Sequence, residues 1–405
     1  MSRLLLTIAV ACLFLMLVAV PALAAQTPIT SAAELTRYLH DTPAGTSPLD
    51  QLSPGGRKRF LAQLDFGDHG VRGFSLSDPQ NELTHQQIVQ LLTLFGLEEY
   101  ASDEGLTPAS QHRIKHERIA DAAARGCTIA TCAESNIEQR YDELVLEKPD
   151  PSIPDAERFA RIGQHYDQLF ASDQLPARMH STSSPDLRLL KRATDQALFA
   201  VPDTAHIAQL QRNLAEMQQR DMVDDVDFQS LYNALLVSRQ FASAEDLARQ
   251  HPGMAVDTVP ILRKSEAAPH GWPTALTVAA QGRTMMREAI DLSTPLRIVV
   301  VASCHFSEDA ARAVESDAQL RPLFARHAIW IASQRESIHS VTDWNHKFQD
   351  QPIRLAWQDS EWSMLDSWAM PTFYVFRNGH LISKFSGWHD LATLKQSLRE
   401  AGALH

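Results

Sequence analysis

The sequence has few cysteines and, beyond its N-terminus, no long apolar run. Of its 405 residues only four are cysteine, at positions 12, 127, 132 and 304. No segment after residue 25 is long and apolar enough to span a bilayer. Three of the four cysteines follow residue 25, and this odd number leaves at least one thiol without a partner inside the chain.

Several motifs of catalysis are also missing. The sequence contains no glycine-rich phosphate loop and no Gly-x-Ser-x-Gly nucleophile elbow. His112 and His116 are one helical turn apart, but no glutamate follows the first histidine, so the zinc-protease signature is absent. A metal shared with Glu117 or a cysteine is the alternative. With 17 histidines in the chain such pairs arise by chance, and we expect neither a metal nor a cofactor.

The chain is acidic. Its formal net charge is −12 at pH 7. A negative protein is repelled by phosphate backbones and by anionic lipid surfaces. This charge argues against nucleic acid and against anionic membranes as partners.

Residues 1–24 have the pattern of a signal peptide. Arg3 supplies the positive start, residues 4–20 form an apolar run, and Ala22-Leu23-Ala24 is a small-residue cleavage site. We expect export to the periplasm or secretion, with no stable membrane insertion after cleavage. An uncleaved membrane anchor is the alternative, because the apolar run is long for a signal. An oxidising compartment would permit disulfides.

Residues 25–270 are predicted to form a helical domain. Ser31-Ala32-Ala33-Glu34 is a capping-box pattern that opens a first helix, and Thr84 opens another with apolar residues on one face. Pro or Gly separates most of the predicted helices. Further helices are expected at residues 108–124, 136–146, 154–171, 185–200 and 205–219.

Residues 228–250 indicate a helical hairpin with two apolar stripes. The spacing resembles the helix pairs of tetratricopeptide-type solenoids. No repeat recurs at a fixed period, so we favour an irregular helical bundle over a solenoid.

The pattern changes near residue 272. Residues 271–294 predict a connecting β-hairpin around Gln281-Gly282. Residues 297–302 form a β-branched run typical of a strand buried on both faces. Asn378-Gly379 between two apolar runs predicts a second, tight hairpin. Other strands are expected at 327–332, 353–357, 372–376 and 380–385, with helices at 307–316, 338–348 and 391–400.

The C-terminal residues 295–405 resemble the thioredoxin superfamily. The resemblance rests on Cys304-His305-Phe306-Ser307 between a strand and a helix, on Met370-Pro371-Thr372 before a strand, and on the Asn378-Gly379 hairpin. It implies an α/β thioredoxin-like C-terminal domain preceded by an all-α N-terminal region, either a bundle or a short helical hairpin. The predicted helix and strand at 338–357 are similar to the insertion of periplasmic thioredoxins that take part in cytochrome maturation.

The resemblance also implies roles for particular residues. Cys304 takes the position of the thiol that attacks a substrate disulfide. Ser307 replaces the second, resolving cysteine and cannot resolve a mixed disulfide. Pro371 matches the cis-proline that lies against the active site, and Met370 and His305 take positions that contact substrate. A helix N-terminus would stabilise the Cys304 thiolate, whereas nearby Glu308 and Asp309 would oppose it.

Cys127 and Cys132 lie close together between a helix-stopping glycine and the next predicted helix. In an oxidising compartment we favour a disulfide that staples this turn. The alternatives are a second redox pair and a resolving partner for Cys304.

Two functions from different classes follow. The first is monothiol thiol–disulfide exchange, or isomerase-type chemistry, on exported proteins through Cys304, with exported clients or a periplasmic redox partner. The second is a non-redox scaffold that uses a degenerate thioredoxin fold to bind proteins. The exposure of Cys304, and its relation to Cys127 and Cys132, distinguish them.

Overall fold

The structure, a computed structural model, describes residues 27–101, 105–148, 150, 152–254, 256, 258–263, 271–279 and 282–404. The signal peptide expected at residues 1–24 lies outside this range. Within it, none of the helices combines the length and the apolar character needed to cross a membrane. The chain divides into two compact units, one up to Gln111 and one from His112 onward.

The first unit is built from short helices around a core of its own. Leu49, Leu91 and Leu92 are fully buried in it, and the rings of Phe60 and Phe95 meet edge to face. The elements of this unit are α1 (Ala32–Asp41), α2 (Pro54–Ala62), β1 (Asp65–Gly67), β2 (Gly70–Gly73), α3 (Ser77–Glu82) and α4 (His85–Thr93), with 3-10 turns at Pro48–Gln51 and Glu98–Tyr100.

The antiparallel pair β1–β2 corrects the expectation that the N-terminal region is purely helical. These strands have three and four residues, too few to show an alternating pattern in the sequence. Gly70 has a φ of +114°, a conformation that favours glycine, and it begins the returning strand.

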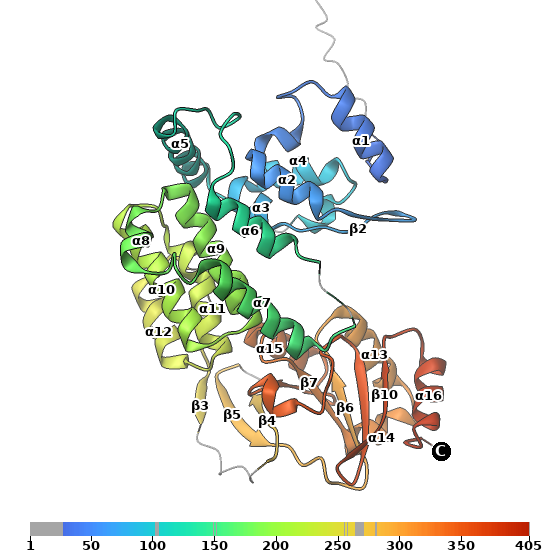
Figure 1. Cartoon of the computed structure of the whole chain (residues 1–405). Helices are drawn as coiled ribbons and strands as arrows, with labels where there is room; N and C mark the ends of the chain where they lie inside the picture. The colour runs from blue at the N-terminus through green and yellow to red at the C-terminus, as the bar shows by residue number, and fades with distance from the viewer. Residues whose placement is uncertain are drawn as a thin grey trace, which may run out of the picture. The chain divides into compact units, whose positions relative to one another are not determined.

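The second unit begins within α5 and continues as an array of helices (Figure 1). Helices α7, α9 and α10 pack side by side, and fully buried Tyr166, Leu187 and Leu190 lie in the core between them. The helices are α5 (Pro108–Ala124), α6 (Asn136–Leu146), α7 (Asp155–Phe170), α8 (Pro176–Ser181), α9 (Ser184–Ala200), α10 (Thr204–Gln219), α11 (Gln229–Val237) and α12 (Phe241–Gln250), with a 3-10 turn at Asp225–Phe228.

The structure confirms the helices expected from residue 108 to residue 250. Their ends follow the capping chemistry in the sequence. The side chains of Ser135, Ser183 and Asp203 accept hydrogen bonds from backbone N–H groups at the starts of α6, α9 and α10. Such caps satisfy donors that have no partner inside the helix, so they fix where the helix begins.

An eight-stranded mixed sheet completes the second unit. Its strand order is β10-β9-β6-β7-β8-β4-β5-β3. Strands β6, β7 and β8 are parallel neighbours, while β9 and β10 run antiparallel at one edge. The strands are β3 (Ile261–Arg263), β4 (Thr274–Val278), β5 (Thr284–Ala289), β6 (Arg297–Val301), β7 (Ala328–Ala332), β8 (Ile353–Ala356), β9 (Thr372–Arg377) and β10 (His380–Ser386).

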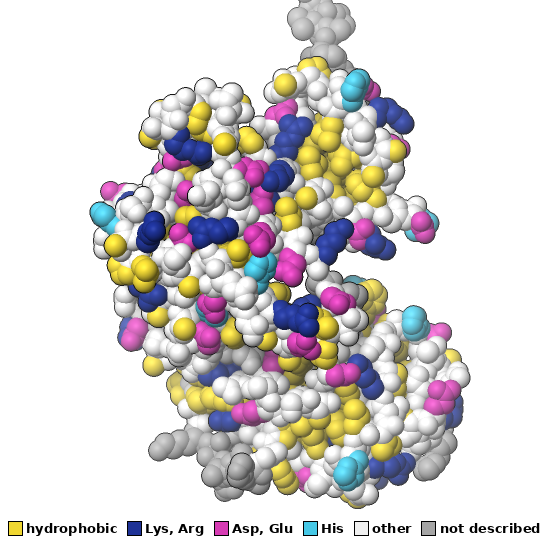
Figure 2. Space-filling view, viewed as in Figure 1, with side chains coloured by type: hydrophobic (Ala, Val, Ile, Leu, Met, Phe, Trp, Pro, Cys, Tyr) yellow, Lys and Arg dark blue, Asp and Glu magenta, His cyan; other side chains and the backbone are white. Residues whose placement is uncertain are grey.

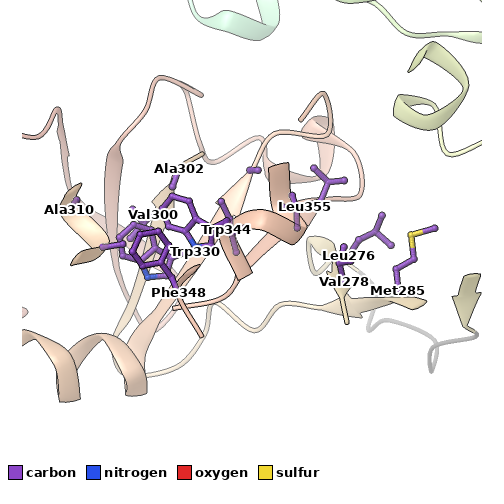
Figure 3. Packing of buried hydrophobic residues seen from close by; sticks show 14 of the residues in the cluster. Leu276, Val278, Met285, Val300, Ala302, Ala310, Trp330, Trp344, Phe348 and Leu355 are labelled. Carbon is purple, nitrogen blue, oxygen red and sulfur yellow. The ribbon is translucent and has the colours of Figure 1, made fainter. Parts of the chain in front are cut away.

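The β-branched strand β6 lies inside the sheet and is buried on both faces. Ile298 and Val300 face one hydrophobic cluster, whereas Val299 and Val301 face another that contains Trp362. Figure 3 shows part of the first cluster, including Val300 and the aromatic residues of β7 and of the helix that follows it. The helices of this part are α13 (His305–Ser316), α14 (Leu320–His327), α15 (Ile338–Lys347) and α16 (Leu391–Glu400), with a 3-10 turn at Asp359–Trp362.

The hairpin expected at 271–294 forms β4 and β5, which extend the sheet beyond β8. Part of its turn lies outside the described residues. The first hydrophobic cluster runs from the sheet into helices α9, α10, α11 and α12. The helices after residue 112 and the sheet thus share one compact unit, which includes the boundaries expected at residues 270 and 294.

Candidate active site

Cys304 lies just after β6 and is the N-cap residue of α13. It is a free, partly exposed cysteine. Ala310, Ala311 and Val314 bury one face of α13, which fixes the start of the helix against the sheet. The Cys304 side chain makes no capping hydrogen bond, while its carbonyl accepts one from Glu308 N–H at 3.1 Å. The sulfur therefore lies at the helix start but does not accept a capping hydrogen bond from the helix.

Two polar atoms lie close to the sulfur. Ser307 Oγ is 3.4 Å from Cys304 Sγ, and the Met370 carbonyl oxygen is 3.7 Å from it. The Met370–Pro371 peptide bond is cis, as the sequence analysis predicts for Pro371. Ser307 is completely buried. The fold thus brings Cys304, Ser307, Met370 and Pro371 together from segments more than sixty residues apart.

The loop that carries Met370 is fixed by hydrogen bonds at its base. Thr372 Oγ1 donates to the Ala369 carbonyl at 2.6 Å, and Gly387 N–H donates to the Pro371 carbonyl at 2.8 Å. These bonds tie the loop to β9 and to the end of β10. The position of the Met370 carbonyl beside the thiol therefore follows from the sheet.

The face around the thiol presents large apolar side chains to solvent. Phe306 is 50% exposed and Met370 is 40% exposed. His305 is also exposed, and its ring centroid is 3.9 Å from that of Phe306. Exposed apolar groups of this size beside a free thiol provide a surface for contact with another molecule.

Glu336 also adjoins this site and was not predicted from the sequence. Ser303 Oγ donates to Glu336 Oε2 at 2.5 Å and lies 3.0 Å from Met370 Sδ. Ser337 N–H donates to the other carboxylate oxygen at 3.0 Å. Ser303 follows β6 and Glu336 follows β7. Because parallel neighbours end at the same edge of a sheet, their strand order was the signal that could have placed these residues together.

Acidic side chains in the first turns of α13 are neutralised by nearby cations. Glu308 pairs with Lys347 at 2.9 Å and Arg312 at 3.4 Å, while Asp309 pairs with Arg312 at 2.8 Å. The hydrogen bond from Arg312 to Asp309 raises the pKa of the Arg312 guanidinium. Both carboxylates that follow Cys304 at the start of α13 are therefore paired with cations.

Helices of the second unit fasten both loops that flank the thiol. Trp368 N–H donates to Asp155 at the start of α7, at 2.9 Å. Arg335 donates to the carbonyls of Phe199 and Ala200 at the end of α9, both at 2.9 Å, and its guanidinium lies 4.3 Å from the Phe159 ring centroid. The helical array therefore contributes to the geometry around Cys304.

Other candidates from the sequence lie in α5 and after it. Cys127 and Cys132 form a disulfide with a Cα–Cα distance of 5.2 Å, the pairing favoured above. His112 and His116 approach with 3.1 Å between their Nε2 atoms. Throughout the described part of the chain, no group of three or more His, Cys, Asp or Glu side chains is arranged to hold a metal ion.

Comparison with protein-family models, with curated proteins and with solved structures finds no match to this chain. On the face drawn in Figure 2, positive and negative side chains are interspersed and are not gathered by sign.

Proposed function

We propose that this chain is an exported protein that carries out thiol–disulfide exchange of the isomerase type through Cys304, on a thioredoxin-like domain. The observation that carries the proposal is the free Cys304 thiol at a strand-to-helix junction, beside the carbonyl of a cis Met370–Pro371 bond. The order of elements along the chain supports the thioredoxin-like assignment, because β6, α13 and β7 come first and the β9–β10 hairpin and α16 come last.

The chemistry needs no bound cofactor. The Cys304 thiolate attacks one sulfur of a client disulfide, so a Cys304–client S–S bond forms as the client S–S bond breaks. The departing client sulfur leaves as a thiolate and takes a proton from water. A different client thiolate then attacks the mixed disulfide and releases Cys304 as a thiolate. The client ends with one disulfide, as it began, but between different cysteines.

Ser307 explains why isomerisation is favoured over reduction. A second cysteine at this position would expel a reduced client and leave an internal disulfide. The Ser307 hydroxyl cannot do so, but at 3.4 Å it can donate a hydrogen bond to the Cys304 thiolate. The mixed disulfide then persists until another thiol reaches it.

Export and the second pair of cysteines are consistent with this role. A signal peptide at residues 1–24 would deliver the chain to a compartment where disulfides form. Cys127 and Cys132 are bonded to each other, which leaves Cys304 as the available thiol among the described residues. Exported clients are the proposed partners, and His305 and Met370 are proposed to contact them.

The test compares the native chain with Cys304→Ser and Ser307→Cys in a host that exports it. On non-reducing gels the native chain should show client adducts that Cys304→Ser abolishes. Purified native protein should reactivate a scrambled multi-disulfide protein, whereas Ser307→Cys should shorten the adducts and gain dithiol reductase activity.

A Cys127→Ser/Cys132→Ser double variant is the matched control and should keep its adducts. If the native chain forms no adducts that depend on Cys304 and Ser307→Cys gains no reductase activity, the exchange function is wrong. The non-redox scaffold would then be the better explanation.

A further inference from the structure

A cavity of about 520 Å³ opens in the second unit between helices α9 and α11 and the loop after β7. Its wall is mainly apolar and includes Leu236, Val256, Val259 and Ile338. This volume is within the usual range of about 300–1,000 Å³ for ligand sites. The cavity therefore has room for one or two large side chains of another molecule.

Glu336 connects this cavity to the thiol. It lines the cavity and also accepts the hydrogen bond from Ser303, the residue before Cys304. Adding the covalent bond lengths along this path to the hydrogen bond places the carboxylate within about 13 Å of the Cys304 sulfur. An extended peptide rises about 3.3–3.6 Å per residue, so about four residues cover this distance.

The cavity and the thiol are both flanked by exposed apolar side chains. Phe199 lines the cavity and is 61% exposed, while Phe306 and Met370 lie beside Cys304. Apolar groups exposed at both positions extend the contact surface beyond the cavity itself. This arrangement suits an extended chain better than a compact small molecule.

The charged side chains of the cavity wall indicate what kind of molecule the cavity can bind. The two arginines of the wall are already engaged, Arg239 with the carbonyls of Ala356 and Trp357, and Arg335 with Asp359. Asp195 pairs with Lys191 at 3.0 Å. Glu336 accepts only from the neutral Ser303 hydroxyl and Ser337 N–H, and no cation of the described residues pairs with it. Its carboxylate is left to attract a cation from outside.

We infer that the cavity binds an extended client peptide, with an apolar side chain in the cavity and a lysine or arginine at Glu336, two to four residues from the cysteine that Cys304 attacks. This inference rests on the proposed function and specifies its substrate. The Glu336 carboxylate would repel a small acidic thiol, and such a thiol has no apolar side chain to contact the wall of the cavity.

The test uses short synthetic peptides, each with one cysteine activated as a mixed disulfide with thiopyridine. A leucine–lysine pair is placed two to four residues from the cysteine, in both chain directions. Matched peptides replace lysine by glutamate, or leucine by serine. Attack by Cys304 releases thiopyridone, which is followed by absorbance. Each rate is divided by the rate with neutral dithiodipyridine for the same protein variant.

In the native chain at low salt, the lysine peptides should react about three times faster than the glutamate peptides, after normalisation. This difference is the scale of an exposed ion pair, and high salt should remove it. Glu336→Gln should also remove it, whereas Glu400→Gln, which lies outside the cavity, should retain it. Leucine should be preferred to serine by about tenfold, because its side chain leaves water. Filling the cavity with Asn233→Phe, or independently with Gln229→Phe, should reduce that preference.

Two failures are distinguishable. If Cys304 does not react with dithiodipyridine or with any peptide, the proposed exchange function fails. If Cys304 reacts but all peptides react at equal normalised rates, the peptide site is wrong and the exchange function stands. Preferences that survive both Glu336→Gln and the filled cavity would likewise overturn the site.

Discussion

At the scale of single residues, the buried Ser307 hydroxyl is a close polar neighbour of the Cys304 sulfur. Its Oγ lies 3.4 Å from the sulfur, and its side chain has no contact with solvent. A hydrogen bond to a charged acceptor contributes about 1.5–3 kcal/mol, more than one between neutral groups. In the proposed exchange function, the serine hydroxyl donates a hydrogen bond to the Cys304 thiolate, although a hydroxyl cannot itself take part in exchange.

Ser307→Ala tests this support. The alanine fits the same space, but the thiolate loses a donor, so the reaction of Cys304 with dithiodipyridine at neutral pH should slow about tenfold. Stopped-flow absorbance measures the rate, and Ser340→Ala, at a partly exposed position of α15, is a control that should leave it unchanged. An unchanged rate in Ser307→Ala would show that the hydroxyl fills space and does not stabilise the thiolate.

At the scale of elements, the start of α9 joins two helices through one buried carboxylate. Asp186 lies in the first turn of α9, and Ser135, the N-cap residue of α6, donates its hydroxyl to it at 2.5 Å. Burial raises the pKa of Asp186, and the hydrogen bond from Ser135 only partly offsets this effect. The charged form of Asp186 therefore lowers the stability of the folded chain relative to the protonated form.

This shift predicts a dependence of stability on pH. Because the folded-state pKa of Asp186 is above its unfolded value of 3.8, its contribution to stability is complete below 3.8 and falls as the pH rises through the folded pKa. Asp186→Asn, which keeps the acceptor for Ser135, should therefore stabilise the chain at pH 7 and lose this advantage towards pH 4. Urea unfolding at several pH values measures the difference.

Asp390, the N-cap of α16, is the matched control because its pKa is shifted the other way. Its carboxylate accepts from Thr393 N–H, and this bond lowers the pKa of Asp390. The carboxylate adds stability above pH 3.8 that is lost on acidification, so Asp390→Asn should not stabilise the chain at pH 7. If both variants respond to pH in the same direction, burial is not the cause at Asp186.

At the scale of the whole molecule, the chain forms two units, and each unit is stabilised by a hydrophobic core of its own. The core of the first unit is formed by residues between Ile29 and Leu97. In the second unit, one cluster continues from the helices at Leu210 and Leu231 into the sheet at Val300. The helices and sheet of the second unit should therefore unfold together.

Calorimetry should accordingly resolve two transitions. Leu91→Ala, at a fully buried position of the first unit, should destabilise one transition by about 2–5 kcal/mol and leave the other in place. Leu210→Ala, equally buried in the second unit, should affect the other transition. A single transition that both variants lower equally would mean that the units fold as one.

The sequence by itself determined most elements of the second unit, because their signals are local. Side-chain caps at Ser135, Ser183 and Asp203 mark helix starts, and the β-branched run of β6 marks a buried strand. The position of Cys304 between strand and helix, and its juxtaposition with Pro371, could also be predicted. Strands β1, β2 and β3 were not predicted, because each has three or four residues and is held by pairing with a neighbouring strand rather than by a local pattern.

Only the tertiary structure decided the surroundings of the thiol. Glu336 reaches Ser303 because β6 and β7 end at the same edge of the sheet, and Arg335 reaches α9 across more than 130 residues of chain. The cavity likewise needs α9, α11 and the loop after β7 at once. Local sequence encodes hydrogen-bond caps and periodicity, whereas contacts between distant loops depend on how every intervening element packs.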